Sequence, residues 1–409
     1  MNTHISTSWI RLSGMLMVLA IQFIMMDVTG IARASDWPTA PTVNAKSWIL
    51  MDARSKQILA ESNAEQQLPP ASLTKLMTLY LIFEDLKLGR LKADAQVNVS
   101  KKAWKIGGST MFLEPRMKPI VGDLIHGIAT LSGNDACIAM AEHIAGSEEA
   151  FAGRMNQKAE ALGMTHSHFV NASGFPAEGH YSSAKDMAIL AAALWRDFPD
   201  RYTVFAEREY SYDGRTQPNR NRLLWSMPEA DGLKTGHTQE AGFCLVASAE
   251  KNNTRFVSAV FGTDSDKERA QQSRVLLTHG FRNFVTLQPA ERDIRRKVQV
   301  FEGKEDHVWL KPAEQVFVTA PVGMQNNVVF HLQYPAPLHA PIQQDSEIGS
   351  VEALLKSSGS DASPLLLNTI PMIAANPVEE ASWFGKQWDR VRLMISPPDV
   401  VTEQNEVSQ

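Results

Sequence analysis

Three short polar strings constrain the fold of this chain more than any other feature of its sequence. They are Ser72-Leu73-Thr74-Lys75, Ser132-Gly133-Asn134 and Lys234-Thr235-Gly236, and they follow one another at intervals of about 60 and 100 residues. The first opens a helical pattern, the second lies between two helical patterns, and the third begins a pattern typical of a strand. Each string is common by itself. Their combination predicts a fold that brings the start of a helix, a loop and a strand to one cleft.

The first 34 residues are typical of an export signal. Arg11 precedes a fifteen-residue apolar run over residues 12–26, which is shorter than the roughly 20 residues that a membrane span needs. Ala32-Arg33-Ala34 then supplies the small residues of a cleavage site. We therefore predict a signal peptide over residues 1–34, with a retained N-terminal anchor as the alternative. Both interpretations predict an exported protein.

The charge of the chain argues against a nucleic-acid partner. The 409 residues carry a net charge of −5, so there is no basic excess to bind phosphates. The length is sufficient for two domains with substantial cores.

Residues 35–290 combine helical patterns with short strand patterns. Apolar runs at 48–51 and 57–60 predict a hairpin, and a helix is expected from beyond Pro70 to near Gly89. The remaining patterns are helical at 121–131, 135–144, 148–162 and 183–194, strand-like at 233–238, 242–249 and 255–261, and helical again after a capping box at Ser265. Helices that flank an antiparallel sheet of early and late strands predict an α+β domain.

The rest of the chain predicts a second domain, a terminal helix and a tail. Short β-rich segments over residues 291–377 predict a small all-β domain. Within residues 378–396, the aromatic side chains of Trp383, Phe384 and Trp388 lie on one arc of a helical wheel and basic side chains lie on the rest. This pattern favours a helix in a membrane interface, with an ordinary helix docked on its own domain as the alternative. Residues 397–409 form the tail.

Ser72 and Lys75 are a candidate nucleophile and base. A serine hydroxyl is a weak nucleophile unless a nearby base removes its proton. A spacing of three residues at a helix start directs both side chains to one side. A lysine acts as the base when burial and a nearby positive charge, such as that of Lys234, lower its pKa. The alternative is a routine helix serine with a solvated lysine, and the presence of the other two strings argues against it.

The other two strings supply groups that a peptide substrate requires. From a loop, the Ser132 hydroxyl relays a proton to a leaving nitrogen and the Asn134 amide holds a peptide group. A simple turn is the alternative for this string. Lys234 and Thr235 offer a cation and a hydroxyl to a carboxylate, while Gly236 lets a substrate backbone approach the strand edge.

The strings match the Ser-x-x-Lys, Ser-x-Asn and Lys-Thr-Gly set of the penicillin-recognising serine enzymes. With Asn219-Arg220-Asn221, Asp231-Gly232-Leu233 and the segment from Tyr181 to Asp186, the chain resembles the low-molecular-mass penicillin-binding proteins that act as D-alanyl-D-alanine carboxypeptidases. The resemblance extends from about residue 40 to the C-terminal helix. It implies a penicillin-binding and β-lactamase-like transpeptidase domain, the β domain, and a helix that anchors the protein peripherally at the periplasmic face of the inner membrane. No cofactor is expected.

The resemblance also implies roles for the residues around the nucleophile. Ser72 is expected to be acylated and Lys75 to be its base. Ser132 and Asn134 are expected to serve proton transfer and substrate holding.

Further residues are implied on the substrate side of the site. Lys234, Thr235 and Arg220 are expected to bind the terminal carboxylate of the substrate. The backbone N–H groups of Ser72 and His237 are expected to form the oxyanion hole. The side chains of Asp186 and His237 are further candidates.

The function implied is a serine carboxypeptidase that removes the terminal D-alanine from peptidoglycan stem pentapeptides and that β-lactams acylate. A β-lactamase, a D,D-endopeptidase and a catalytically silent, membrane-tethered peptidoglycan-binding protein are the alternatives. Class A β-lactamases use a loop glutamate for deacylation, and no Glu-x-x-Leu-Asn stretch occurs between Asn134 and Lys234.

The cysteines and paired histidines suggest no second kind of site. Two separate buried thiols at Cys137 and Cys244 are favoured over a disulfide. His166 and His168 lack the accompanying carboxylates of a metal site, so no metal is expected.

Overall fold

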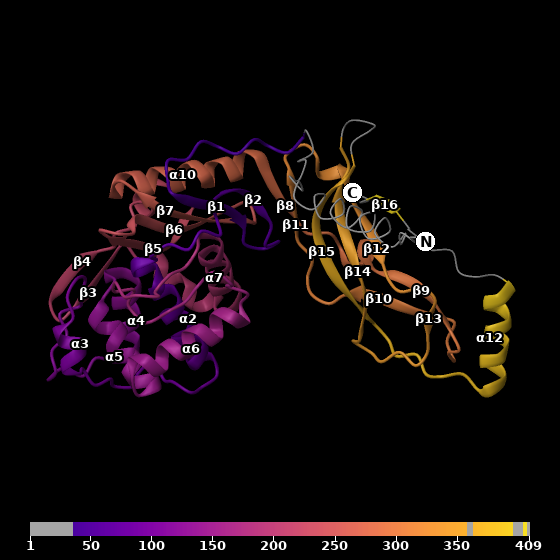
Figure 1. Ribbon diagram of the computed structural model, residues 1–409, viewed down its shortest axis with the longest axis horizontal. Helices are drawn as coiled ribbons and strands as arrows, with labels where there is room; N and C mark the ends of the chain where they lie inside the picture. Colours follow the sequence, from indigo (N-terminus) through magenta and orange to yellow (C-terminus); the bar gives the residue numbers. More distant parts are fainter. Residues whose placement is uncertain (1–35, 358–362, 396–403, 407–409) are drawn as a thin grey trace, which may run out of the picture.

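The structure is a computed structural model that describes residues 36–357, 363–395 and 404–406. The signal peptide predicted over residues 1–34 and most of the predicted tail lie outside the described residues. A domain of helices and a sheet lies at one end of the molecule, a β domain follows it, and a helix lies at the other end (Figure 1).

The first domain is built on a five-stranded sheet with the order β2-β1-β7-β6-β5. Its strands are β1 (Ser47–Asp52), β2 (Ile58–Ser62), β5 (Ala230–Thr238), β6 (Gly242–Lys251) and β7 (Thr254–Thr263). All four pairings are antiparallel, and the β1–β7 pairing joins the early hairpin to the late strands. The α+β class expected from the sequence is therefore confirmed. Strand β5, which contains the third string, lies at an edge of this sheet.

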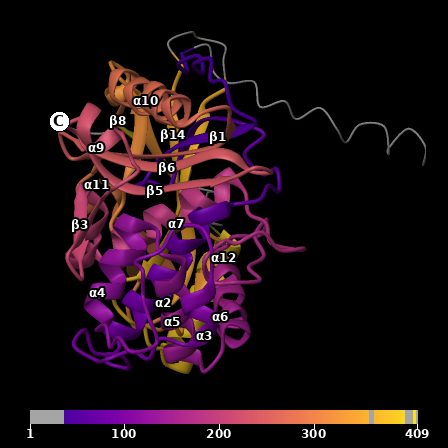
Figure 2. The same cartoon turned by 90° about the vertical axis from the view of Figure 1, so that its left-hand side faces the viewer.

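Helices cover both faces of the sheet (Figures 1 and 2). On one face lies α10 (Asp266–Asn283), whose first turn is capped by the Ser265 hydroxyl accepting from the N–H of Glu268, and whose Leu276 and Leu277 are fully buried. On the other face are α2 (Lys75–Lys87), α3 (Lys101–Lys105), α4 (Val121–His126), α5 (Asn134–Ala145), α6 (Glu148–Ala161) and α7 (Ala184–Asp197). The shorter elements are η1 (Ala71–Thr74), α8 (Pro199–Tyr202), η3 (Thr203–Ala206), β3 (Glu209–Tyr212), β4 (Arg215–Pro218) and α9 (Leu223–Ser226).

The helix expected over residues 121–131 is two elements. α4 ends at His126, and a π-helical turn, η2 (Gly127–Leu131), follows it. Gly127 is packed so closely against Met111 that a Cβ there would lie 1.8 Å from the Met111 sulfur. Ser132 then adopts a left-handed backbone conformation (φ 62°, ψ 34°), which ends the helical path and turns the chain into α5.

The β domain is a seven-stranded sheet with the order β13-β9-β10-β15-β14-β12-β16. Its strands are β9 (Arg296–Phe301), β10 (His307–Pro312), β12 (Val328–Gln333), β13 (Leu338–His339), β14 (Glu347–Leu355), β15 (Leu365–Ala374) and β16 (Gln404–Glu406), with the short helices α11 (Glu291–Ile294) and η4 (Gln325–Asn327). Val308, Leu310, Val351 and Ala353 are fully buried at alternate positions of two strands, as one covered face requires.

A polar joint connects the two domains. Strand β8 (Phe284–Leu287) pairs with β11 (Val318–Pro321), across the boundary expected between residues 290 and 291. The carboxylate of Asp52 on β1 accepts hydrogen bonds from the hydroxyls of Thr286 and Thr319 on these two strands. Because Asp52 is fully buried, burial raises the pKa of its carboxyl group.

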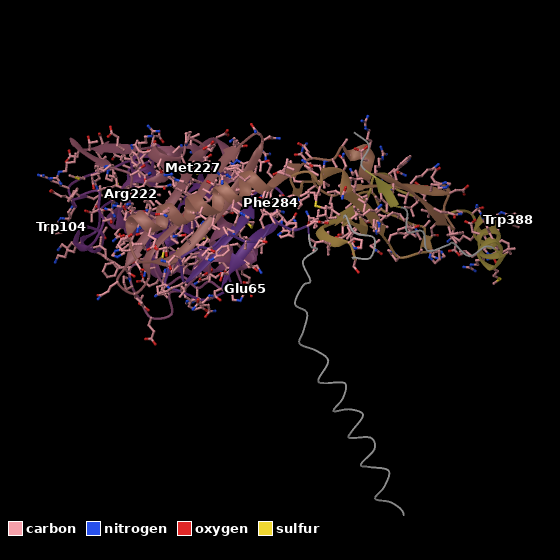
Figure 3. All side chains as sticks on the ribbon, turned by 90° about the horizontal axis from the view of Figure 1, so that it is seen from above. Glu65, Trp104, Arg222, Met227, Phe284 and Trp388 are labelled. Carbon is pink, nitrogen blue, oxygen red and sulfur yellow. The ribbon has the colours of Figure 1, made fainter. Side chains whose placement is uncertain are left out.

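The last helix, α12 (Trp383–Ile395), lies beyond the β domain, and Trp388 marks its place at the end of the molecule farthest from the first domain (Figures 1 and 3). Among the described residues, no helix is both long enough and apolar enough to cross a membrane.

Candidate active site

The first string spans the junction between η1 and the start of α2. Residues 71–74 are the 3-10 turn η1, and α2 starts at Lys75. Ala71, the first residue of this turn, has a left-handed backbone (φ 47°). Lys75 is fully buried, and its Nζ lies 2.9 Å from the Oγ of Ser72. The predicted nucleophile and base are therefore in direct contact.

Two further acceptors surround the Lys75 amine. Its Nζ donates to the Oδ1 of Asn134 at 2.7 Å and to the backbone carbonyl of Ser173 at 2.5 Å. The Nδ2 of Asn134 donates to the carbonyl of Gly107 at 2.8 Å, which fixes the orientation of the amide. The second string is thus joined to the first through Asn134.

Burial controls the charge of this amine. Burial, helped by the positive charge of Arg220, lowers the pKa of Lys75 to about 8 against the opposing effects of Cys137 and Asp135. At pH 7 a lysine with a pKa near 8 is neutral in roughly one molecule in ten. A neutral fraction of this size is sufficient for the Lys75 amine to act as a base.

Ser132 lies at the junction of η2 and α5 and is almost completely buried, with 2% of its surface exposed. The neighbouring N–H of Gly133 donates to the carbonyl of Gly127, which closes the π-helical turn behind it. Ser132 therefore has a fixed position, two residues before the Asn134 that contacts Lys75.

Strand β5 passes closely in front of η1. A Cβ on Gly236 would lie 3.0 Å from the carbonyl oxygen of Pro70 and 3.4 Å from the Cβ of Ala71, so a larger residue would push the nucleophile away. This close packing is the structural reason for the glycine. Lys234 lies on the same face of the strand, two residues away. It is buried, and burial together with the charges of Lys75 and Arg220 holds its pKa well below the ordinary value.

The remaining predicted residues occupy different surroundings. Thr235 is buried on β5, whereas His237 is exposed and its ring lies 4.0 Å from that of Phe243. Arg220 is exposed, and its guanidinium donates to the hydroxyl of Ser109. Asp186 is not part of the group around Lys75; its carboxylate accepts from the N–H of His166 and the hydroxyl of Ser167 at the first turn of α7.

One loop that supports the second string was not predicted from the sequence. The N–H of Asn134 donates to the carbonyl of Ser109, and the carboxylate of Asp135 accepts from the N–H groups of Met111 and Leu113. The loop from Gly107 to Leu113 is therefore tied to the start of α5. Nothing in the periodicity of the sequence indicates this long-range attachment.

The turn that supplies the Ser173 carbonyl was not predicted either. The Oδ1 of Asn171 accepts from the N–H groups of Ser173, Gly174 and Phe175. Gly174 has φ 79°, and a Cβ there would lie 1.8 Å from the carbonyl oxygen of Ala71. The order Asn-x-Ser-Gly is typical of such a turn, so this segment was detectable from the sequence.

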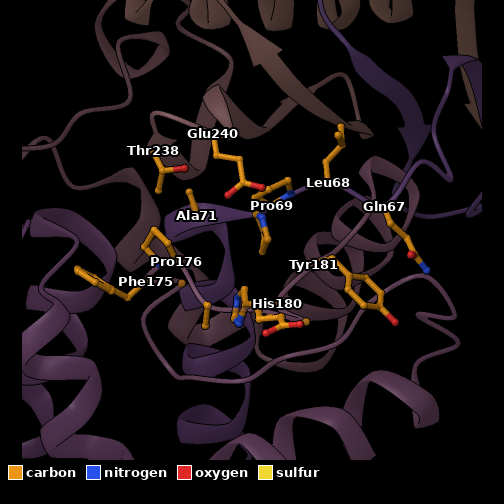
Figure 4. Close-up of a pocket in the computed structure, with 15 residues that line it drawn as sticks. Gln67, Leu68, Pro69, Ala71, Phe175, Pro176, His180, Tyr181, Thr238 and Glu240 are labelled. Atoms are coloured by element: carbon orange, nitrogen blue, oxygen red, sulfur yellow. The ribbon is translucent and has the colours of Figure 1, made fainter.

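A cavity of about 570 Å³ adjoins Ala71, the residue before the nucleophile (Figure 4). It is lined by residues 67–71 up to the start of η1, the segment 174–181, and the end of β5 with the turn after it, among them Ala71, His180, Thr238 and Glu240. His180 is held by two hydrogen bonds: its Nδ1 accepts from the N–H of Val170, so its Nε2 donates to the hydroxyl of Thr74. Burial lowers the pKa of His180 to about 4, so this wall of the cavity is uncharged at neutral pH.

Both cysteines are free and buried, as favoured from the sequence. Cys137 is on α5 and Cys244 is on β6, and burial raises the pKa of both thiols.

Three features of this site occur together: a serine hydroxyl contacts a buried lysine, an amide fixes that lysine, and an edge strand carries a lysine. They define a serine acyl-transfer enzyme of the penicillin-recognising class. A family model described as D-alanyl-D-alanine carboxypeptidase matches residues 34–265, and one described as the C-terminal domain of penicillin-binding protein 5 matches residues 284–380. The chain belongs to this family of D-alanyl-D-alanine carboxypeptidases.

Individual relatives agree with this assignment. The chain is 41% identical to the D-alanyl-D-alanine carboxypeptidase DacC of Escherichia coli over 380 residues, which cover 91% of this chain and 93% of the relative. The solved structure of penicillin-binding protein 5 from Haemophilus influenzae is similar with a TM-score of 0.78 and 35% identity, over 84% of this chain and 100% of that one. Penicillin-binding protein D2 from Listeria monocytogenes, solved in an ampicillin-bound form, is similar with a TM-score of 0.55 and 29% identity, over 59% of this chain and 100% of that one. The β-lactamase and D,D-endopeptidase alternatives are not favoured.

Proposed function

We propose that this carboxypeptidase acts through an acyl-enzyme on Ser72, with Lys75 as the base. The observation that carries the proposal is the surroundings of the Lys75 amine. Asn134 Oδ1 and the Ser173 carbonyl only accept hydrogen bonds, so in the neutral amine they take both N–H groups. The lone pair is then directed at the remaining neighbour, the Ser72 hydroxyl 2.9 Å away.

The reaction follows from this arrangement. Lys75 takes the proton of Ser72, and the Oγ attacks the carbonyl carbon of the penultimate D-alanine of a peptidoglycan stem pentapeptide. The C–N bond breaks, and the proton returns through the Ser132 hydroxyl to the leaving nitrogen of the terminal D-alanine. Water then hydrolyses the ester, with Lys75 again as the base, and regenerates Ser72.

Positive charge binds the end of the substrate. Lys234 and Arg220 lie close enough to one another and to Lys75 for each charge to affect the pKa of a neighbour. A carboxylate relieves this repulsion, so we assign the terminal carboxylate to Lys234, Thr235 and Arg220. The backbone N–H groups of Ser72 and His237 are the proposed oxyanion hole.

A β-lactam presents a carboxylate and a reactive amide in the same relation, so we expect it to acylate Ser72. The ampicillin-bound form of the Listeria relative supports this expectation.

Replacement of the nucleophile tests the proposal. The Ser72→Ala variant is expected to lose covalent labelling by a fluorescent penicillin and to release D-alanine at least about a thousandfold more slowly from a peptide ending in D-Ala-D-Ala. Gel fluorescence and a D-alanine assay measure the two effects. Ser226→Ala, which changes an exposed hydroxyl on α9, should behave as the wild type. A label that persists on Ser72→Ala would show that another residue is acylated.

We also propose that the protein is exported by residues 1–34 and works at the periplasmic face of the inner membrane. The support is the way α12 is attached. Its polar side contacts the β domain, because Asp389 accepts from the N–H of Glu302 and Arg390 donates to the Glu302 carboxylate. Trp383 and Phe384 are 66% and 79% exposed. A helix docked only on its own domain buries its apolar side instead, so this orientation favours a lipid surface as the partner.

A further inference from the structure

The backbone of Ala172 is held from both sides, directly before the carbonyl that accepts from Lys75. Its N–H donates to a carboxylate oxygen of Glu148 at 3.1 Å, and its carbonyl accepts from the hydroxyl of Thr78 at 2.6 Å. Ala172 and Thr78 are fully buried, and Glu148 is buried too. The next carbonyl along the chain is that of Ser173, which accepts from the Lys75 amine. Glu148 and Thr78 therefore fix the segment that presents this acceptor.

Glu148 is a buried carboxylate, which is costly unless it is paired and hydrogen-bonded. It is the first residue of α6, where an acidic side chain favours the positive end of the helix. Glu149 meets the same requirement from the surface, with 77% of its side chain exposed, and both carboxylates pair with Lys102 on α3. Of the two, Glu148 is the one that accepts from the backbone of Ala172. This hydrogen bond is therefore the contact that its burial provides.

The held segment controls the direction of the base. Thr78 follows Lys75 by three residues on α2, so the helix that carries the base also holds the segment that orients it. Glu148 attaches the same segment to α6. The Ser173 carbonyl takes one N–H of the neutral amine, which leaves the lone pair for the Ser72 hydroxyl. A displaced Ser173 would no longer impose this direction.

We propose that Glu148 is a positioning residue for the base: through the backbone of Ala172 it holds the Ser173 carbonyl against the Lys75 amine. The inference rests on the proposed function, in which neutral Lys75 activates Ser72. Glu148 takes no part in the making or breaking of bonds. Its removal should therefore change the direction and the pKa of the amine, whereas a role confined to the stability of α6 would leave both unchanged.

The sign of the pKa change follows from the charge of the amine. A protonated amine donates a stronger hydrogen bond to a carbonyl than a neutral amine does, so the Ser173 carbonyl favours protonated Lys75. Loss of this acceptor should lower the pKa of Lys75 below its present value of about 8. The neutral amine then forms at lower pH, but it is less well directed at Ser72, so acylation should be slower where the pH profile levels off.

Glu148→Ala and Glu148→Gln separate the hydrogen bond from the charge, because the second variant retains an oxygen for the N–H of Ala172. We expect Glu148→Ala to reduce the plateau of the second-order rate constant for acylation by penicillin about 10- to 100-fold, as a small displacement of a reacting group does. The midpoint of its pH profile should move to lower pH. Glu148→Gln should keep the plateau within about threefold of the wild type, with a smaller shift of the midpoint. Stopped-flow measurements on both sides of the midpoint determine the two quantities.

Thr78→Val reaches the same segment without a change of charge. It removes the hydroxyl that donates to the Ala172 carbonyl, whereas Thr78→Ser retains that hydroxyl. We expect Thr78→Val to lower the plateau and the midpoint as Glu148→Ala does, and Thr78→Ser to keep both close to the wild type. All four variants retain the titratable groups that act on the pKa of Lys75, which are Cys137, Arg220 and Asp135.

Glu149→Ala is the matched control, because Glu149 also pairs with Lys102 but is exposed, and it should leave the plateau and the midpoint unchanged. If Glu148→Ala lowers only the free energy of unfolding in urea and keeps the wild-type pH profile, the role is structural and the positioning proposal is overturned. If Glu148→Ala does not fold, an unchanged profile of Thr78→Val overturns it instead. A wild type that penicillin does not label, or whose profile is flat, would overturn the proposed function and this inference with it.

Discussion

At the scale of single residues, the decisive group is the Lys75 amine. Its neighbours determine both its charge and the direction in which its lone pair points. Two carbonyl-type acceptors leave one position for the Ser72 hydroxyl. The same three acceptors also satisfy the protonated amine, so the group moves between its two states without rearrangement of its partners. Burial then decides how often the neutral state occurs.

A pH profile tests this account of Lys75. Its pKa in the folded protein is about 8, below the ordinary value of 10.5, and the neutral form is the active one. The second-order rate constant of acylation, measured at penicillin concentrations well below saturation, should therefore increase tenfold per pH unit well below pH 8 and level off above it. Stopped-flow measurement between pH 6 and 9.5 determines the midpoint.

Removal of a neighbouring charge should move that midpoint. Arg220→Gln is expected to shift it to higher pH, because the guanidinium of Arg220 lowers the pKa of Lys75. Arg222→Gln changes a nearby surface arginine that pairs with Asp266, and it should leave the midpoint unchanged. A profile that is flat across pH 8 would contradict the role of Lys75 as the base.

At the scale of elements, the site depends on segments that approach one another closely. The turn at Gly174 touches the backbone of Ala71 and also supplies the Ser173 carbonyl to Lys75. Gly236 makes a similar approach from β5. Glycine is required at these two points because each holds a neighbouring segment against the nucleophile.

Gly174→Ala and Gly163→Ala form a matched pair that measures this requirement. Both glycines have left-handed backbones, at φ 79° and φ 76°, but only the Gly174 Cβ would overlap another group. Gly163→Ala should lower the free energy of unfolding by about 1 kcal/mol, from backbone strain alone. Gly174→Ala should lower it by about 2–4 kcal/mol and also slow acylation. Urea denaturation and penicillin labelling check the two effects, and equal losses in both variants would contradict the close approach.

The sequence predicted the helices and strands that have a hydrophobic periodicity or a capping residue. The start of α2, the strand β5 and the Ser265 cap of α10 were all expected from local patterns. The loop from Gly107 to Leu113 was not, because its order comes from hydrogen bonds to Asn134 and Asp135, which are distant in sequence. Within the site, the contact between Ser72 and Lys75 was predictable from helical spacing, whereas the contribution of Ser173 required the fold.

At the scale of the whole molecule, the β domain separates the active site from α12 (Figure 1). The proposed membrane contact and the chemistry are therefore independent. Trp388→Ser, which alters a side chain that is 72% exposed, should weaken binding to vesicles of anionic phospholipid about tenfold. Hydrolysis of a soluble peptide should not change.

Trp104→Ser is the control for this experiment, since Trp104 is an exposed tryptophan on α3 in the catalytic domain. Cosedimentation with vesicles measures both variants. If they lose binding equally, or if neither does, the assignment of α12 to the lipid surface is wrong.

The left-handed backbones of Ala71 and Ser132 have an evolutionary consequence. Neither residue is glycine, and each such conformation costs roughly 1–2 kcal/mol. Selection for thermal stability alone would favour glycine at both positions, yet at Ser132 this exchange removes the hydroxyl assigned to proton transfer. The active site is therefore expected to remain below the stability optimum for as long as activity is under selection. In a lineage that no longer needs the enzyme, these are positions at which glycine should appear early.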